Sequence, residues 1–155
     1  MTHYLYLHGF QSGPQSLKAR ETQAYLHAIT PEASFSSPQL SPYPAQAIAQ
    51  VEALIDSIKQ PLVLIGSSLG GYYATCLAER FGLPAVLINP AVDPALDLAA
   101  HVGEQAAFHD PTQRFDFQAH YLDELRALQA GPLPDPARVL AVIAKGDELL
   151  DWREM

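Results

Sequence analysis

The sequence has little cysteine and few basic residues, and it has no long apolar run. Its one cysteine, Cys76, cannot form a disulfide within the chain, which fits a reducing compartment. Lys and Arg total 9 against 17 Asp and Glu, a formal charge of −8, and this balance argues against nucleic acids and anionic membranes as partners. No apolar run approaches the roughly 18 residues of a membrane span. The sequence therefore predicts a cytoplasmic protein whose partner is a small molecule.

Segments with strand and helix patterns alternate along the chain. At 48% hydrophobic residues, the 155 residues suit one domain with a single core, over residues 1–155. Alternation of this kind predicts a mainly parallel α/β sheet of about five strands, whose carboxyl edge collects the functional loops. We expect strands at residues 3–7, 33–38, 62–65, 84–88 and 138–144, and helices at 17–29, 45–59, 69–81 and 118–129.

One stretch carries the strongest chemical signal. Gly66, Ser68 and Gly70 hold the fixed places of a G-x-S-x-G pattern between an apolar strand and a helix, which is the context of a nucleophile elbow. Glycines two residues either side let the chain turn sharply, and the helix that starts at Leu69 directs its first amides at a developing oxyanion. The alternative is an ordinary β-to-α turn in which Ser67 or Ser68 caps the helix.

Three loops converge at the predicted edge, at residues 8–11, 67–71 and 145–151. Serine acyl transfer needs a nucleophile, a base, an acid and two oxyanion donors. We assign Ser68 as nucleophile, and the backbone N–H groups of Phe10 and Leu69 as oxyanion donors. Asp147 is the acid, with Asp151 as the alternative; both could instead be solvated carboxylates at a helix start. We expect the substrate to contact four residues of these loops, His8, Gly9, Gln11 and Ser67.

The histidines do not complete this set. The order Ser, Asp, His that is usual in α/β-hydrolases requires a histidine after Asp147, and none follows it. His8 has the alternative task of shaping its loop. His101, His109 and His120 lack the close spacing of metal ligands, so we expect no metal site and no cofactor. Each is interpreted as a surface histidine, although any one could serve as base.

An insertion at residues 92–136 separates the last two predicted strands. Its periodicity is weak, and prolines interrupt it. An insertion this long should lie over something, so we expect a helical cap near Ser68. An ordinary connecting helix with irregular loops is the alternative.

Four ordered blocks of sequence resemble the YqiA-type esterase family, a small group of α/β-hydrolases. The blocks span the whole chain, and together they are more specific than the G-x-S-x-G pattern alone. They are Tyr6 to Phe10 with Ser12, Pro14, Ser16 and Lys18; Gly66 to Tyr72; Asn89 to Ala91; and Gly146 to Glu148 with Leu150 and Asp151.

The resemblance implies an α/β-hydrolase-type three-layer sandwich that hydrolyses carboxylic esters or acyl thioesters. Ser68 is then the nucleophile and Asp147 the acid. Members of the family continue for a few dozen residues beyond this point, through a loop that bears the catalytic histidine. The resemblance therefore implies that this chain is C-terminally truncated, lacks its base, and can self-associate through an uncovered sheet edge.

Two other classes of function compete with this interpretation. A non-catalytic small-molecule-binding protein would keep the fold and the pocket without the base. Nucleotide binding is disfavoured, because residues 66–71 fit neither G-x-G-x-x-G nor the P-loop, which needs Lys where this chain has Gly71.

Overall fold

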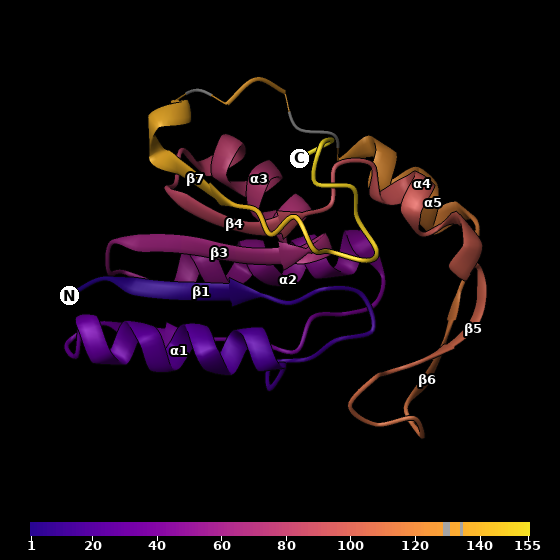
Figure 1. Cartoon of the computed structure of the whole chain (residues 1–155), viewed down its shortest axis with the longest axis horizontal. Coiled ribbons are helices and arrows are strands. Elements are labelled where there is room, and N and C mark those ends of the chain that lie inside the picture. The colour runs from indigo at the N-terminus through magenta and orange to yellow at the C-terminus, as the bar shows by residue number, and fades with distance from the viewer. Residues whose placement is uncertain (129–130, 134) are drawn as a thin grey trace.

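A parallel five-stranded sheet lies at the centre of the fold (Figure 1). The structure is a computed structural model that describes residues 1–128, 131–133 and 135–155. Neighbouring strands are parallel throughout, in the order β2-β1-β3-β4-β7. This arrangement confirms the predicted α/β fold class. The strands are β1 (His3–Leu7), β2 (Ser34–Ser36), β3 (Leu62–Ser68), β4 (Ala85–Pro90) and β7 (Val139–Val142).

Helices cover both faces of this sheet and give it three layers. The longer helices are α1 (Leu17–Ile29), α2 (Pro44–Ser57) and α3 (Leu69–Phe81). Leu5, Leu7 and Leu64 point to the face covered by α2 and α3, within the larger apolar cluster. Tyr6 and Ile65 alternate to the other face and pack with α1. The sandwich predicted from the family resemblance is therefore confirmed.

Local sequence signals account for the helix ends. The Ser16 side chain accepts a hydrogen bond from the Ala19 N–H and so satisfies one of the first free amides of α1. Helix α3 ends at Gly82, whose φ of +63° is a left-handed conformation that glycine adopts without steric cost. Strand β1 and helices α1 and α3 have the bounds predicted from the sequence.

The insertion contains more regular structure than its sequence indicates. Its elements are α4 (Pro94–Asp97), the short 3-10 helix η1 (Ala99–His101), β5 (Gly103–Ala106), β6 (Arg114–Phe117), α5 (His120–Ala127) and the 3-10 helix η2 (Pro136–Arg138). Helix α5 agrees with the helix predicted at residues 118–129, whose last residue lies outside the described residues.

The antiparallel pair β5 and β6 is a correction, because the sequence predicts only helix and irregular loops there. Each strand has only four residues; β5 (Gly-Glu-Gln-Ala) has no apolar alternation, and the alternation of charged and aromatic residues in β6 (Arg-Phe-Asp-Phe) is too short to predict a strand by itself. Their pairing depends on contacts with the rest of the fold. Phe117 at the end of β6 is fully buried in the larger apolar cluster, together with Leu122 and Leu125 of α5.

The carboxyl ends of β1 and β3 point toward the insertion (Figure 1). The hairpin of β5 and β6 projects beside the sheet, and the loop that follows β1 contacts it through Gln11. In the part of the chain that the structure describes, no helix has the length and apolarity needed to cross a membrane.

Candidate active site

The turn from β3 into α3 places Ser68 in a strained backbone conformation. Ser68 has φ +55° and ψ −120°, a combination that few residues other than glycine adopt. The strand ends at Ser68 and the helix begins at Leu69, so no loop separates them. The Ser68 carbonyl accepts a hydrogen bond from the Ala91 N–H over 2.9 Å, which ties the turn to the end of β4.

Both glycines that flank this turn are required by close backbone contacts. A β-carbon on Gly66 would lie 2.2 Å from the carbonyl oxygen of Gly70, and one on Gly70 would lie 2.0 Å from the carbonyl oxygen of Leu7. No side chain fits at such distances. The G-x-S-x-G pattern thus has a steric cause, since the turn can form only where these two positions carry no β-carbon.

The loop of residues 8–12 lies against Ser68. A β-carbon on Gly9 would stand 3.3 Å from Cβ and 3.8 Å from Oγ of Ser68. Phe10 follows, outside any helix or strand, and within the described residues its N–H donates to no backbone carbonyl. Leu69 begins α3, where the first N–H groups have no partner inside the helix. Two backbone donors therefore flank Ser68 without an intrahelical or strand partner.

The Phe10 ring anchors this loop to the insertion. It makes edge contacts with Phe115 and Phe117 of β6, at ring-centroid distances of 5.6 and 5.0 Å. His101 of η1 packs on the same ring at 5.7 Å. The position of the Phe10 backbone thus depends on the hairpin.

His8 holds the loop with both ring nitrogens. Nδ1 donates to the carbonyl of Gly9 over 2.8 Å, and Nε2 accepts from the Leu40 N–H over 3.0 Å. A carbonyl can only accept and an N–H can only donate, so these partners fix the neutral tautomer. Burial lowers the pKa of His8; the Gly9 hydrogen bond opposes this, and the nearby His109 adds to it. His8 is therefore a neutral positioning group whose accepting nitrogen is occupied.

Gln11 joins the same loop to the hairpin. Its φ is +60°, and its carbonyl accepts from the Phe108 N–H over 2.8 Å. Its side-chain amide donates to the Ala106 carbonyl over 2.8 Å and to Oε1 of Gln105 over 3.1 Å. The amide of Gln11 is therefore engaged with the insertion at the wall of the cavity described below.

Ser67 lies apart from the other predicted contact residues. It is buried, and its hydroxyl hydrogen-bonds to the Tyr6 hydroxyl, which also contacts Ser16. Tyr6 packs with α1, so the Ser67 side chain lies on the α1 side of the sheet. The structure brings together Ser68, Gly9, Phe10 and Leu69, and it does not bring the Ser67 hydroxyl to them.

Asp147 is held in the loop after β7. Its Oδ1 accepts the N–H groups of Leu149 and Leu150, each over 2.9 Å, and its Oδ2 accepts from Nδ2 of Asn89 over 2.9 Å. Burial alone would raise the pKa of Asp147, but these hydrogen bonds and the positive charge of Lys18 outweigh it, and the pKa is lowered. Asp147 is therefore an ionised carboxylate with a fixed orientation.

Asp151 has a different environment. Its carboxylate accepts from its near neighbour Arg153 through the backbone N–H and the guanidinium. Both side chains are exposed, Arg153 to 70% and Asp151 to 45%, and an ion pair at such a position contributes little. Of the two predicted carboxylates, Asp147 is the one fixed by a buried partner.

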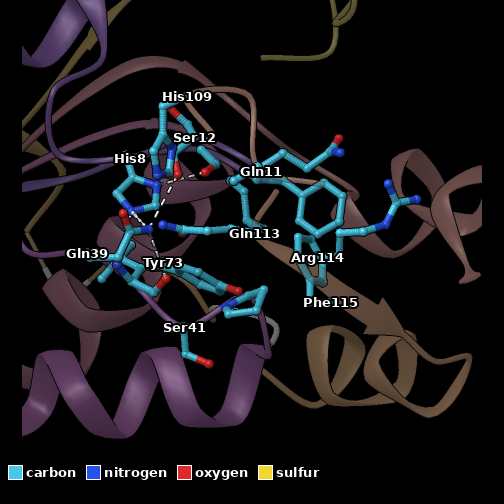
Figure 2. Close-up of a pocket in the computed structure, with 16 residues that line it drawn as sticks. His8, Gln11, Ser12, Gln39, Ser41, Tyr73, His109, Gln113, Arg114 and Phe115 are labelled. Atoms are coloured by element: carbon cyan, nitrogen blue, oxygen red, sulfur yellow. Dashed lines mark hydrogen bonds between the residues drawn. The ribbon is translucent and has the colours of Figure 1, made fainter. Parts of the chain in front are cut away.

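A cavity of about 240 Å³ opens between the loop of residues 8–12 and the hairpin (Figure 2). His8, Ser12, Gln39 and His109 gather on one side of it, and the guanidinium of Arg114 points away from them. The full lining is His8 to Ser12, Gln39 to Pro42, Leu69, Tyr73, Ala107, His109, Gln113, Arg114 and Phe115. The cavity therefore begins beside Gly9 and Leu69, the neighbours of Ser68.

Gln39 and Asn89 are not among the predicted site residues. Gln39 donates to Nε2 of His8, and Asn89 donates to Asp147. Asn89 falls in one of the blocks that carry the family resemblance, and that block is the one sequence signal for it. Gln39 reaches His8 only through tertiary packing, since 31 residues separate them.

The remaining titratable groups offer no further site. In residues 1–128, 131–133 and 135–155, no group of three or more His, Cys, Asp and Glu side chains could hold a metal ion. Cys76 is buried in α3 and donates to the Leu128 carbonyl over 2.9 Å. Cys76 is thus part of the larger apolar core.

Comparison with known proteins gives the same fold. The structure is similar to the α/β hydrolase domain-containing protein 10 from mouse, with a TM-score of 0.74 and 16% identity over 97% of this chain and 72% of that chain. It is also similar to Est1E from Butyrivibrio proteoclasticus, solved with ferulic acid bound. The TM-score is 0.69, and the identity is 15% over 99% of this chain and 72% of that chain. It also matches a Paleococcus ferrophilus monoacylglycerol lipase, with a TM-score of 0.65 and 15% identity over 98% and 76%.

A family model covers nearly the whole sequence. It describes an uncharacterised protein family, UPF0227, and it matches residues 3–155. The matched range includes all four blocks on which the family resemblance rests.

Proposed function

Because the chain belongs to the uncharacterised protein family UPF0227, the YqiA-type family, and has an α/β-hydrolase fold, we propose that it is a serine esterase. The substrate is a carboxylic ester or an acyl thioester. Structural neighbours that are named as esterases and lipases support a hydrolase. Because their identity to this chain is low, the argument for this activity depends on the site itself.

The observation that carries the proposal is the conformation of Ser68. Ser68 has φ +55° and lies directly between a strand and a helix. Neighbouring backbone atoms approach both flanking glycines so closely that neither could carry a β-carbon. This is the geometry of a nucleophile elbow. Strain of this kind persists where the surrounding fold imposes it, and it is concentrated at functional sites. A simple N-cap would not require it, and the Ser68 side chain makes no capping hydrogen bond.

The chemistry is acyl transfer in two steps. As the Ser68 oxygen attacks the acyl carbonyl carbon, the base takes the hydroxyl proton and the carbonyl electron pair moves to oxygen, where the N–H groups of Phe10 and Leu69 stabilise the negative charge. The intermediate then expels the alcohol or thiol, which takes that proton from the base, and the acyl group remains on Ser68. In the second step the base takes a proton from the attacking water and returns it to the Ser68 oxygen as the acid is released.

Asp147 is the acid of this site in our proposal. A triad acid must be ionised and must hold a fixed direction, because it orients the base and stabilises its protonated form. The hydrogen bonds to both oxygens of Asp147 supply these properties. Asp151 contacts its exposed neighbour Arg153 and has no comparable set of hydrogen bonds to both oxygens within the described residues.

The base is the remaining element, and the contacts of the six histidines support none of them for this task. His8 already uses its accepting nitrogen for Leu40, and His3 contacts Ser34 and Ser36 beside β2. In the described part of the chain, no histidine forms a hydrogen bond with Ser68 or Asp147. We therefore propose that the base is a histidine outside these six, in agreement with the family resemblance.

The size of the cavity limits the acyl group. About 240 Å³ beside Ser68 is less than the roughly 300–1,000 Å³ of sites for drug-sized ligands. A short acyl chain fits this volume, and a long fatty acyl chain would have to extend outside it. The wall contains both aromatic and amide side chains, Phe115 and Gln113 among them.

The test is hydrolysis of p-nitrophenyl acetate, butyrate and decanoate by the protein made from its complete gene, beside its Ser68→Ala variant. The proposal predicts turnover of acetate and butyrate that exceeds turnover of decanoate, and its loss in Ser68→Ala. Turnover that survives in Ser68→Ala would contradict the proposal. Thermal stabilisation by an ester without any turnover would favour the non-catalytic binding protein.

A further inference from the structure

Asn89, the residue before the last of β4, has a backbone conformation that is unusual for a strand. Its φ is +43°, and it is 3% exposed. Asparagine tolerates the left-handed region better than most residues do, because its short side chain can bond to nearby backbone. A buried amide in such a conformation must find partners for its oxygen and its two N–H groups.

The Asn89 side chain satisfies all of its hydrogen-bonding groups on the segment after β7. Its Oδ1 accepts from the Ala144 N–H over 2.9 Å, and its Nδ2 donates to the Ala144 carbonyl over 3.1 Å. The second N–H of Nδ2 donates to Oδ2 of Asp147 over 2.9 Å. One side chain therefore holds both the backbone that leads to Asp147 and the carboxylate itself.

This contact continues the pairing of two strands. Strands β4 and β7 pair up to Ile88 and Val142. After Val142 the segment that follows β7 leaves the sheet. There the side-chain amide of Asn89, in place of a backbone group of β4, makes the hydrogen bonds to the backbone of Ala144. Segment 143–147 is thus fixed to the end of β4 although it is no longer part of the sheet.

We propose that Asn89 is a positioning residue, which orients the Asp147 carboxylate for the base and keeps it ionised. The inference rests on the proposed function of Asp147 as triad acid. Its geometric basis is that the two oxygens of the Asp147 carboxylate accept hydrogen bonds from different groups. Oδ1 is occupied by the N–H groups of Leu149 and Leu150. Among the residues that the structure describes, Oδ2 has one hydrogen-bond partner, Asn89, and a carboxylate oxygen has room for a second donor.

Two substitutions separate this role from a purely structural one. Asn89→Gly removes the side chain while suiting the positive φ. Asn89→Asp has the same shape and keeps an acceptor for the Ala144 N–H, but it replaces the donor to both the Ala144 carbonyl and Asp147 with a second carboxylate oxygen. Asp151→Asn is the matched control, because it removes a carboxylate from the same segment without touching Asn89.

The primary measurement is the titration of the Asp147 carboxyl carbon by NMR in the full chain, with the Asp147→Asn variant used for assignment. We expect the titration midpoint to rise by about one pH unit in Asn89→Gly, because a hydrogen bond to an ionised group contributes about tenfold or more to an equilibrium. It should rise further in Asn89→Asp, where two carboxylates share one site. Asp151→Asn should leave it unchanged.

An unchanged Asp147 midpoint in either folded Asn89 variant would overturn the inference. If Asn89→Gly does not fold, Asn89→Asp decides the question, since it preserves shape and the contact with the Ala144 N–H.

The second measurement is ester hydrolysis, and it distinguishes failure of the inference from failure of the proposed function. We expect kcat for p-nitrophenyl acetate to fall about ten- to hundredfold in both Asn89 variants, with KM changed less than about twofold. Ser68-dependent turnover that is unaffected by Asn89→Gly would overturn the positioning role alone. Absence of Ser68-dependent turnover in the parent protein would overturn the proposed function, whatever the Asp147 titration shows.

Discussion

The Cα atom of Gly70 packs against the carbonyl oxygen of Leu7 so closely that a β-carbon at residue 70 would lie 2.0 Å from that oxygen. This contact joins the start of α3 to the end of β1. It sets how near the loop of residues 8–12 approaches Ser68, because that loop follows Leu7 directly. The distance between the nucleophile and its predicted oxyanion donor is thus fixed by two backbones in contact.

Gly70→Ala should therefore destabilise the protein severely. The backbone of β1 cannot move away without disturbing the centre of the sheet, so we expect the free energy of unfolding to fall by roughly 4 kcal/mol or more. Urea denaturation followed by circular dichroism measures this loss. Gly146→Ala is the control, because a β-carbon there meets no atom within 4 Å and should change stability by less than about 0.5 kcal/mol. Equal midpoints for the two variants would contradict the packing argument.

Gln11→Ala should loosen the hairpin of β5 and β6. The substitution removes the two side-chain hydrogen bonds to Gln105 and Ala106. Each contributes about 1 kcal/mol, so we expect the amides of Ala107 and Phe108 to exchange with solvent about ten- to hundredfold faster. Hydrogen-exchange NMR measures these rates. Gln15→Ala, a change at an exposed position of the same loop, should leave them as they are, and unaltered exchange in Gln11→Ala would show that the hairpin is held by other contacts.

The two predicted carboxylates should differ sharply in their effect on catalysis. Asp147→Asn removes the negative charge that stabilises a protonated base, and we expect kcat for p-nitrophenyl acetate to fall by about three to four orders of magnitude. Asp151→Asn should retain kcat within about twofold, because its ion pair with Arg153 is exposed. Steady-state kinetics on both variants gives the comparison. The reverse order of effects would move the acid to Asp151.

His8 should make stability depend on pH near neutrality. Burial lowers the pKa of His8 in the folded state, so between that value and the ordinary value of about 6.5 the unfolded chain binds a proton that the folded chain does not. The contribution of His8 is therefore complete above about pH 7 and is lost as the pH falls through 6.5 toward the folded pKa. His8→Gln keeps an acceptor but does not titrate, and its urea midpoint should fall less between pH 7 and pH 5. If the urea midpoints of the parent protein and of His8→Gln fall equally between pH 7 and pH 5, His8 is not the source of this pH dependence.

The sequence predicts the parts of this molecule that depend on local patterns. The strand and helix around Ser68 follow from an apolar run, two glycines and a helical stripe, and the structure has α3 at the predicted residues. Phe10 and Leu69 could be named because a parallel sheet brings the ends of its strands to one edge. The contacts of Gln39 with His8 and of Asn89 with Asp147 could not be predicted from local patterns, because they join segments 31 and 58 residues apart.

The hairpin shows why the insertion was harder to predict. Strands β5 and β6 have only four residues each, and they are stabilised by contacts of Phe115 and Phe117 with Phe10. Phe115 and Phe117 do alternate with charged residues, but over four residues only, and their contact with Phe10 belongs to the tertiary structure. The environment of Ser67 has the same origin, since its hydroxyl contacts Tyr6 of the neighbouring strand.

The most direct test of the central claim, that Ser68 is an activated nucleophile, is its reaction with a fluorophosphonate. The reagent forms a covalent adduct with an activated serine and does not react with an ordinary hydroxyl. We predict one adduct per chain in the protein made from its complete gene, mapped by mass spectrometry to the peptide that contains Ser68, and no adduct in Ser68→Ala. Ser67→Ala should still be labelled, because the Ser67 hydroxyl contacts Tyr6. An unlabelled Ser68 in that folded protein would contradict the account.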